Sequence, residues 1–243
     1  ADEAGAALSD ADFVFEGVPE TEDAKRDAFA LIDRHAGPET VITSTTSTFL
    51  STMLAEMVAD RSRFLNAHWL NPAYIVPLVE LSPTPETDPA VTARTKALLE
   101  GIGKVPVVCA ASPGYIVPRI QALAMNEAAR MVEEGVASAE EIDKAVKYGF
   151  GFRFAVLGLL EFIDWGGGDI LYYASRYMAQ ATGEDRFKAP EIVERNMAEG
   201  RLGLRSGEGF YDYKDMDVSA YQAERLKAFL AALENSGLSR PPE

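Results

Sequence analysis

Short apolar segments alternate with amphipathic segments along the first half of the chain. The apolar segments predict buried strands at residues 12–18, 41–44, 64–68, 76–81 and 105–109. Between them, apolar residues recur at helical spacing and predict helices at residues 22–35, 49–59 and 88–102. Strands that are separated by helices favour an open α/β sheet, with parallel crossovers at least in its first part.

The pattern changes at Ser112-Pro113-Gly114, and nearly all later apolar positions have helical spacing. A helix begins near Tyr115 and ends at Gly135, and Ser138 opens the next helix with a capping-box pattern. Apolar helices are also predicted near residues 156–163 and 169–181. We therefore predict an α/β domain at residues 1–111 and an all-helical domain at residues 112–243.

The composition is that of a globular protein, with 47% apolar and 25% charged residues. The 23 basic and 38 acidic residues give a net charge of −15, which repels phosphate and disfavours nucleic acid as a partner. No apolar run approaches the ~18 residues that cross a membrane, so we expect a soluble, cytoplasmic protein with no membrane partner. The acidic start, in which no basic residue precedes Lys25, predicts a loosely held segment.

The few cysteine and histidine residues narrow the candidate chemistry. Cys109 is the only cysteine, and His35 and His68 are the only histidines, so neither a disulfide framework nor a metal centre is expected. His68 ends a strand, where an open α/β sheet binds its ligand. Glu80 ends the next strand, and a connection of that length can place its carboxylate beside the imidazole. A surface histidine and an unrelated glutamate are the alternative.

Ser47 lies in a hydroxyl-rich turn, residues 44–48, after the second predicted strand. Its hydroxyl could hydrogen-bond a substrate oxygen, and the alternative is that Ser47 or Thr48 only caps the helix predicted from Phe49. No Gly-x-Ser-x-Gly motif surrounds Ser47, which disfavours a hydrolase triad.

Several motifs follow one another in a characteristic order. They include Ala67-His68-Trp69-Leu70-Asn71-Pro72, Ser112-Pro113-Gly114-Tyr115-Ile116-Val117 and Ser206-Gly207-Glu208-Gly209-Phe210-Tyr211. In these motifs the chain resembles the 3-hydroxyacyl-CoA dehydrogenase family from about residue 10 to residue 213. The resemblance implies an incomplete Rossmann-type domain followed by a helical dimerisation domain. Because no Gly-x-Gly-x-x-Gly loop occurs in the sequence, it also implies that the opening βαβ unit is missing, through a fragment or a misassigned gene start.

The resemblance further implies NAD as the cofactor and a role for each matching residue. His68 matches the catalytic base, Glu80 the acid that pairs with it, and Ser47 the hydroxyl that contacts the substrate and the nicotinamide ribose. Glu20, Lys25 and Asn71 match positions around the cofactor, and Arg205 lies where the family usually has a lysine that contacts the cofactor. The implied substrate is a 3-hydroxyacyl-CoA such as 3-hydroxybutyryl-CoA, and the implied assembly is a homodimer.

Two departures from the family pattern bear on the substrate. Pro118 replaces an active-site asparagine that follows the glycine of a Pro-Gly-Phe motif, so one polar contact is absent or comes from another group. Arg153 lies in a Phe-Arg-Phe turn where acyl-CoA enzymes carry a Pro-Met-Gly-Pro-like sequence. Its planar fork suits a substrate carboxylate, and an exposed surface charge is the alternative.

Three functions remain open at this point. The first is an NAD-dependent 3-hydroxyacyl-CoA dehydrogenase. The second is a dehydrogenase of a small free hydroxy or aldehyde acid that Arg153 binds. The third is a catalytically silent dimeric remnant.

Overall fold

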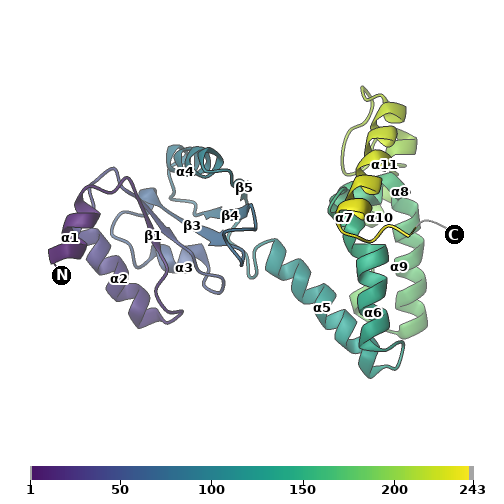
Figure 1. Ribbon diagram of the computed structural model, residues 1–243, viewed down its shortest axis with the longest axis horizontal. Helices are drawn as coiled ribbons and strands as arrows, with labels where there is room; N and C mark the ends of the chain where they lie inside the picture. Colours follow the sequence, from purple (N-terminus) through teal and green to yellow (C-terminus); the bar gives the residue numbers. More distant parts are fainter. Residues whose placement is uncertain (1, 241–243) are drawn as a thin grey trace. The chain divides into compact units, whose positions relative to one another are not determined.

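A computed structural model describes residues 2–240 of the chain (Figure 1). The chain divides into two compact units, with the division after Glu127. This division lies inside helix α5 (Val117–Glu133), whereas the sequence pattern predicts a domain boundary after residue 111. The sequence pattern marks where strands give way to helices. In the structure, the first turns of α5 belong to the same compact unit as the sheet.

The first unit is built on one five-stranded sheet in the order β1-β2-β3-β4-β5. The strands are β1 (Phe13–Glu16), β2 (Val41–Ser44), β3 (Phe64–Trp69), β4 (Leu78–Pro83) and β5 (Val105–Val108). The first three are parallel, β4 runs antiparallel to β3, and β5 is parallel to β4. The predicted open α/β sheet with a parallel first part is therefore confirmed.

Local capping explains where the helices of this unit begin. They are α1 (Asp2–Ser9), α2 (Glu22–His35), α3 (Ser51–Ala55) and α4 (Pro89–Gly101), with a 3₁₀ turn at Arg61–Arg63. The Thr21 side chain accepts the Ala24 N–H at 3.4 Å ahead of α2. The Asp88 carboxylate accepts the Ala90 N–H at 2.8 Å ahead of α4, whose first residue is a proline.

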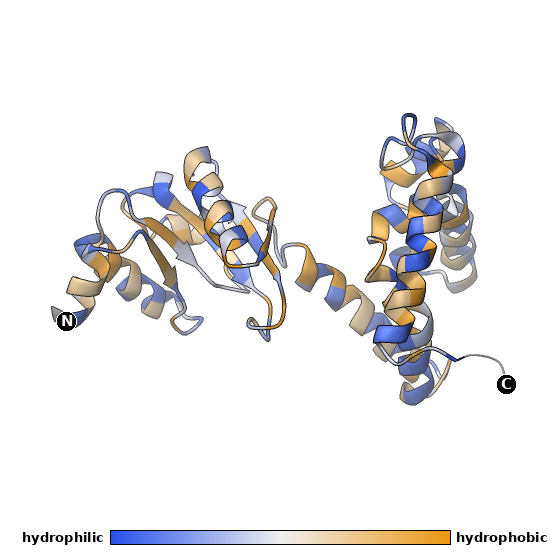
Figure 2. Cartoon of the chain, turned by 45° about the horizontal axis from the view of Figure 1, so that its top comes forward, coloured by the Kyte–Doolittle hydropathy of each residue, from blue (hydrophilic) through white to orange (hydrophobic). Residues whose placement is uncertain are grey.

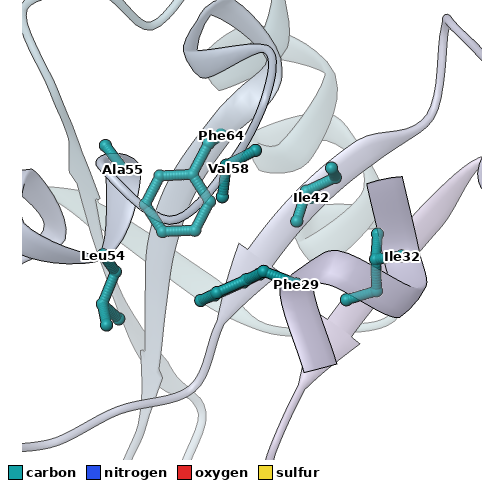
Figure 3. Close-up of a cluster of buried hydrophobic side chains, with 7 residues drawn as sticks. All are labelled: Phe29, Ile32, Ile42, Leu54, Ala55, Val58 and Phe64. Atoms are coloured by element: carbon teal, nitrogen blue, oxygen red, sulfur yellow. The ribbon is translucent and has the colours of Figure 1, made fainter. Parts of the chain in front are cut away.

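Apolar side chains cover both faces of the sheet. One cluster packs α2 and α3 against the sheet (Figure 3) and contains Phe29, Ile32, Ile42, Leu54, Ala55, Val58 and Phe64. A second cluster contains Val41, Leu65, Ala67, Val79, Leu81, Val91 and Leu99. Neighbouring residues such as Phe64 and Leu65 join different clusters because successive strand residues point to opposite faces. Burial on both faces explains why β2, β3 and β4 contain adjacent apolar residues.

Three expectations for the first unit are wrong in part. The acidic start forms α1, since Gly5 lies against the His35 side chain and Leu8 packs on the first apolar cluster. The helix predicted at residues 49–59 is confined to α3 because residues 46–49 form a hydrogen-bonded turn. The strand predicted at residues 76–81 begins at Leu78, since the Lys104 ammonium donates to the Ala73 and Val76 carbonyls and holds residues 73–76 outside the sheet.

The second unit contains helices and no strand among its described residues, as predicted, with isolated β-bridges from Glu208 to Gly203 and to Asp212. Its α-helices are α6 (Ala139–Ala145), α7 (Phe152–Phe154), α8 (Leu159–Gly166), α9 (Gly168–Thr182), α10 (Glu191–Ala198) and α11 (Val218–Asn235). A π-helical segment (Val146–Gly151) precedes α7, and 3₁₀ turns occupy Asp185–Phe187 and Leu204–Ser206. Apolar and polar residues alternate along the helices in Figure 2. Of the helices in residues 2–240, none has the length and apolarity that a membrane span requires.

The helix predicted at residues 156–163 begins later, at Leu159. Gly158 has an extended backbone, and its N–H donates to the Glu161 side chain at 3.2 Å. This hydrogen bond fixes the first turn of α8, and residues 156–158 lie outside it.

A buried aspartate in α8 organises the glycine-rich segment near the end of the second unit. The Asp164 carboxylate accepts the backbone N–H groups of Phe210 and Tyr211 at 3.0 and 2.9 Å and the Tyr213 hydroxyl at 3.1 Å. A Cβ atom at Gly209 would overlap this carboxylate. A glycine at position 209 is thus required for the close approach of the backbone to Asp164.

We predict that Gly209→Ala destabilises the second unit by ~1–3 kcal/mol, the usual cost of forcing an extra group into a packed site. Thermal unfolding followed by circular dichroism measures the change. Gly166→Ala is the matched control because a Cβ atom there meets nothing within 4 Å. Equal melting temperatures for the two variants would contradict the role assigned to Gly209.

Candidate active site

The candidate residues of the first unit gather where parallel strands end. The carboxyl ends of β1, β2 and β3 lie at the same edge of the sheet because these strands are parallel. Glu20 follows β1 and Ser47 follows β2. His68 is the penultimate residue of β3. Open α/β sheets bind their ligands at this edge.

His68 and Glu80 form a buried pair across two antiparallel strands. They are directly opposite in the pairing of β3 with β4, and His68 Nδ1 lies 2.8 Å from Glu80 Oε2. The histidine is 3% exposed and the glutamate is fully buried. The sequence spacing predicts this proximity, and the antiparallel turn between the strands produces it.

The second oxygen of Glu80 binds the start of helix α5. Glu80 Oε1 accepts the N–H groups of Ile116 and Val117 at 2.9 and 2.8 Å. The next residue, Pro118, has no N–H group to offer. An ionised carboxylate only accepts hydrogen bonds, so the proton between Oε2 and the imidazole belongs to Nδ1. The lone pair of the neutral ring is then on Nε2.

The Ser47 hydroxyl faces this lone pair. Ser47 Oγ lies 3.0 Å from His68 Nε2, and the serine is exposed. The interpretation of Ser47 or Thr48 as the cap of the following helix is wrong, because the Thr46 hydroxyl accepts the Thr48 and Phe49 N–H groups instead. Ser47, His68 and Glu80 therefore form one hydrogen-bonded chain that is accessible at its serine end.

Lys25 is completely buried between two carboxylates. Its ammonium lies 3.1 Å from Glu16 Oε2 and 3.3 Å from Glu20 Oε1. The second oxygen of Glu20 accepts the Thr46 hydroxyl at 2.5 Å and the Thr48 hydroxyl at 2.8 Å. Partial burial alone would raise the pKa of Glu20, but these hydrogen bonds and the Lys25 charge lower it below its ordinary value. The structure thus brings the predicted residues Glu20 and Lys25 together at the turn that carries Ser47.

Asn71 and the two predicted arginines have different surroundings. Asn71 is exposed in the segment after β3 and precedes a cis proline. In the second unit, Arg153 Nε donates to the Gly149 carbonyl at 2.6 Å, and its guanidinium lies 4.9 Å from the centre of the Phe162 ring. Arg205 pairs with Asp169, whose carboxylate raises the pKa of the guanidinium. The roles proposed for these three residues stay predictions.

Five buried polar residues near the site were not foreseen from the sequence. They are Glu16, Ser44, Thr46, Asn66 and Tyr115. The one available signal was the position of Asn66, which lies two residues before His68 and so on the same face of β3. Within residues 2–240, no three His, Cys, Asp or Glu side chains gather in a way that could hold a metal ion.

Two family models cover most of the chain. Residues 1–112 match the NAD binding domain of 3-hydroxyacyl-CoA dehydrogenase, and residues 114–213 match the C-terminal domain of the same enzyme. The chain belongs to the 3-hydroxyacyl-CoA dehydrogenase family. The predicted oxidoreductase class and the NAD cofactor are confirmed by these matches.

Individual relatives differ in the substrates that their names state. A 5-formyl-3-hydroxy-2-methylpyridine 4-carboxylate 5-dehydrogenase of Mesorhizobium japonicum is 33% identical over 95% of this chain and 74% of its own length. A probable 3-hydroxybutyryl-CoA dehydrogenase of Deinococcus radiodurans is 32% identical over 85% of this chain and 73% of its own length. The crystal structure of a 3-hydroxyacyl-CoA dehydrogenase from Archaeoglobus fulgidus superposes with a TM-score of 0.82 at 33% identity, covering 96% of this chain and 79% of that chain.

The donor set at the sheet edge fits the nicotinamide end of NAD. Glu20 offers a carboxylate that is 42% exposed, which suits ribose hydroxyls, and Ser47 offers an exposed hydroxyl. The sequence carries no glycine-rich loop of the kind that binds a pyrophosphate. The residues present would therefore hold the ribose and position the reacting ring.

We predict that His68→Ala lowers kcat by roughly 10²–10⁴, the range for a general base. Glu80→Gln keeps the shape of the side chain but removes the negative charge beside Nδ1. The imidazolium is then less stabilised, so this substitution should also lower kcat. Steady-state oxidation rates measured by NADH absorbance test both. His35→Ala is the matched control, since His35 lies at the end of α2. An active His68→Ala enzyme would remove this residue from the mechanism.

Proposed function

We propose that this protein interconverts a 3-hydroxyacyl-CoA, such as 3-hydroxybutyryl-CoA, and its 3-keto form. The observation that carries the proposal is the hydrogen-bonded chain of Ser47, His68 and Glu80 at the ligand-binding edge of an NAD-binding sheet. Oxidation of an alcohol requires a base for the hydroxyl proton and donors for the oxygen that becomes a carbonyl. The chain of three side chains supplies both.

In the proposed mechanism, the substrate hydroxyl binds between Ser47 Oγ and His68 Nε2. The hydroxyl proton passes to Nε2, where the lone pair lies. Glu80 stabilises the imidazolium through Nδ1, and the Ser47 hydroxyl donates to the substrate oxygen as the carbonyl forms. NAD⁺, when bound, would supply the acceptor for the hydride of the carbinol carbon. In the reverse direction, the imidazolium returns the proton.

A free carboxylic acid is the second candidate substrate. The relative from Mesorhizobium japonicum has a pyridine carboxylate in its name. In this chain, contacts to Gly149 and Phe162 hold Arg153, and its two terminal nitrogens have no hydrogen-bond partner among residues 2–240. Such a fork can bind a carboxylate through two parallel hydrogen bonds.

Turnover of acetoacetyl-CoA and of free 3-keto acids with NADH distinguishes the two candidates. If Arg153 binds a carboxylate, Arg153→Ala should lower kcat/KM for the free acids about 10–100-fold, the range for a charge-assisted hydrogen bond. Arg176→Ala is the matched control because Arg176 also lies over an aromatic ring in the second unit. Unchanged kcat/KM for free acids in Arg153→Ala would remove Arg153 as the carboxylate ligand, and the absence of free-acid turnover in the wild type would eliminate the second candidate. No turnover of either class would overturn the proposed function and leave the silent remnant.

We also propose a homodimer, which the second unit supports. Ile170, Tyr173 and Tyr177 lie on one face of α9 and are 61%, 59% and 73% exposed. Exposed apolar side chains that share a helix face are typical of an interface. Besides the second copy of the chain, the expected partner is the small-molecule or acyl-CoA substrate. The cytoplasmic location stays a prediction.

Tyr177→Glu should shift the sedimentation coefficient from that of a dimer to that of a monomer, because the charge would be buried in the interface. Analytical ultracentrifugation measures the shift. Tyr74→Glu changes an exposed tyrosine of the first unit and serves as the control. A wild-type chain that sediments as a monomer would contradict the dimer.

A further inference from the structure

Two buried polar residues lie behind His68 and tie it to the turn that carries Ser47. We propose that Tyr115 and Asn66 are positioning residues that hold the Ser47 hydroxyl at His68 Nε2. This inference rests on the proposed function, because it assigns the pair an effect on the same reaction.

Tyr115 supports the imidazole on one face. The ring of Tyr115 stacks on the His68 ring, with the centres 5.3 Å apart and the planes 24° from parallel. Its hydroxyl donates to the Phe49 carbonyl at 2.8 Å and accepts from Asn66 Nδ2 at 2.8 Å. The tyrosine is 5% exposed, so neither the ring nor the hydroxyl is free to move without breaking these contacts.

The backbone of Tyr115 also indicates a constraint. Its φ of 44° lies in the left-handed region, which residues other than glycine seldom adopt. Strained conformations persist only where the surroundings hold them, and they cluster at functional sites. At Tyr115 the surroundings include Glu80, which binds the next two backbone N–H groups.

Asn66 connects Tyr115 to the Ser47 turn. Its Nδ2 group donates to the Thr46 carbonyl at 3.2 Å as well as to the Tyr115 hydroxyl. The carbonyls on both sides of Ser47 are thereby anchored, that of Thr46 directly and that of Phe49 through Tyr115. Both anchors depend on Asn66 of β3, the strand that carries His68. They therefore fix the position of the Ser47 turn relative to the imidazole.

The burial of Asn66 argues against a role in stability alone. The side chain is fully buried, and its Oδ1 atom has no hydrogen-bond partner among the described residues. A buried amide oxygen without a partner destabilises a fold, and an apolar residue of similar size avoids that cost. The best explanation for Asn66 and Tyr115 is that their hydrogen bonds hold the Thr46 and Phe49 carbonyls in place.

The test compares Tyr115→Phe in two backgrounds, wild type and Ser47→Ala. The substitution keeps the stacked ring and removes only the hydroxyl. We expect kcat to fall between threefold and about 100-fold in the wild-type background, the upper limit being the cost of a 1 Å misplacement. In the Ser47→Ala background the same substitution should change kcat less than twofold, because the group that it positions is already absent. Asn66→Ala, in the same two backgrounds, provides a second measurement if Tyr115→Phe does not fold.

Tyr221→Phe is the matched control, since its hydroxyl donates to Glu161 in the second unit and has no place in the reaction. It should leave kcat unchanged. Equal losses for Tyr115→Phe in both backgrounds, or no loss in either, would overturn the positioning role. Full activity of His68→Ala would instead overturn the proposed function, so the two failures are distinguishable.

Discussion

The structure of the site depends on how one buried carboxylate is neutralised. Glu80 has no contact with solvent, and taking such a group out of water is costly unless every lone pair has a donor. Three donors meet it: the imidazole of His68, the N–H group of Ile116, and the N–H group of Val117 at the start of α5. The same carboxylate therefore joins β3, β4 and the start of α5, and the orientation of the imidazole follows from where that helix begins.

A second buried charge stabilises the opposite side of the site. Lys25 lies between Glu16 and Glu20, and Glu20 in turn accepts two hydroxyls from the turn after β2. Each of the hydrogen bonds from α2 to the Ser47 turn thus has a charged group on at least one side. Breaking a buried ion pair on one side leaves an uncompensated charge, so this arrangement resists local change. The negative net charge of the chain has little influence here, because the local partners are much closer than the surface carboxylates.

Sequence patterns predicted the elements that depend on local signals. The bounds of α2 and β2 were predicted to the residue, since capping groups and a Gly-Pro pair delimit them. The proximity of His68 and Glu80 was also foreseen, because two strands and a connection suffice for it. The hydroxyl partners were not: whether Thr46 or Ser47 caps the turn depends on Glu20, which is remote in sequence. Asn66 and Tyr115 are 49 residues apart, and no local pattern reports such a contact.

The antiparallel register of β3 and β4 has a consequence for how the family can vary. Residues 70–77 leave and re-enter the sheet at fixed positions, so insertions or deletions in this connection alter the loop and preserve the facing pair. A slip of one residue within either strand would instead present Val79 or Leu81 to the imidazole and turn the carboxylate toward the other face of the sheet. The length of the connection can therefore change, whereas the register of β3 and β4 cannot.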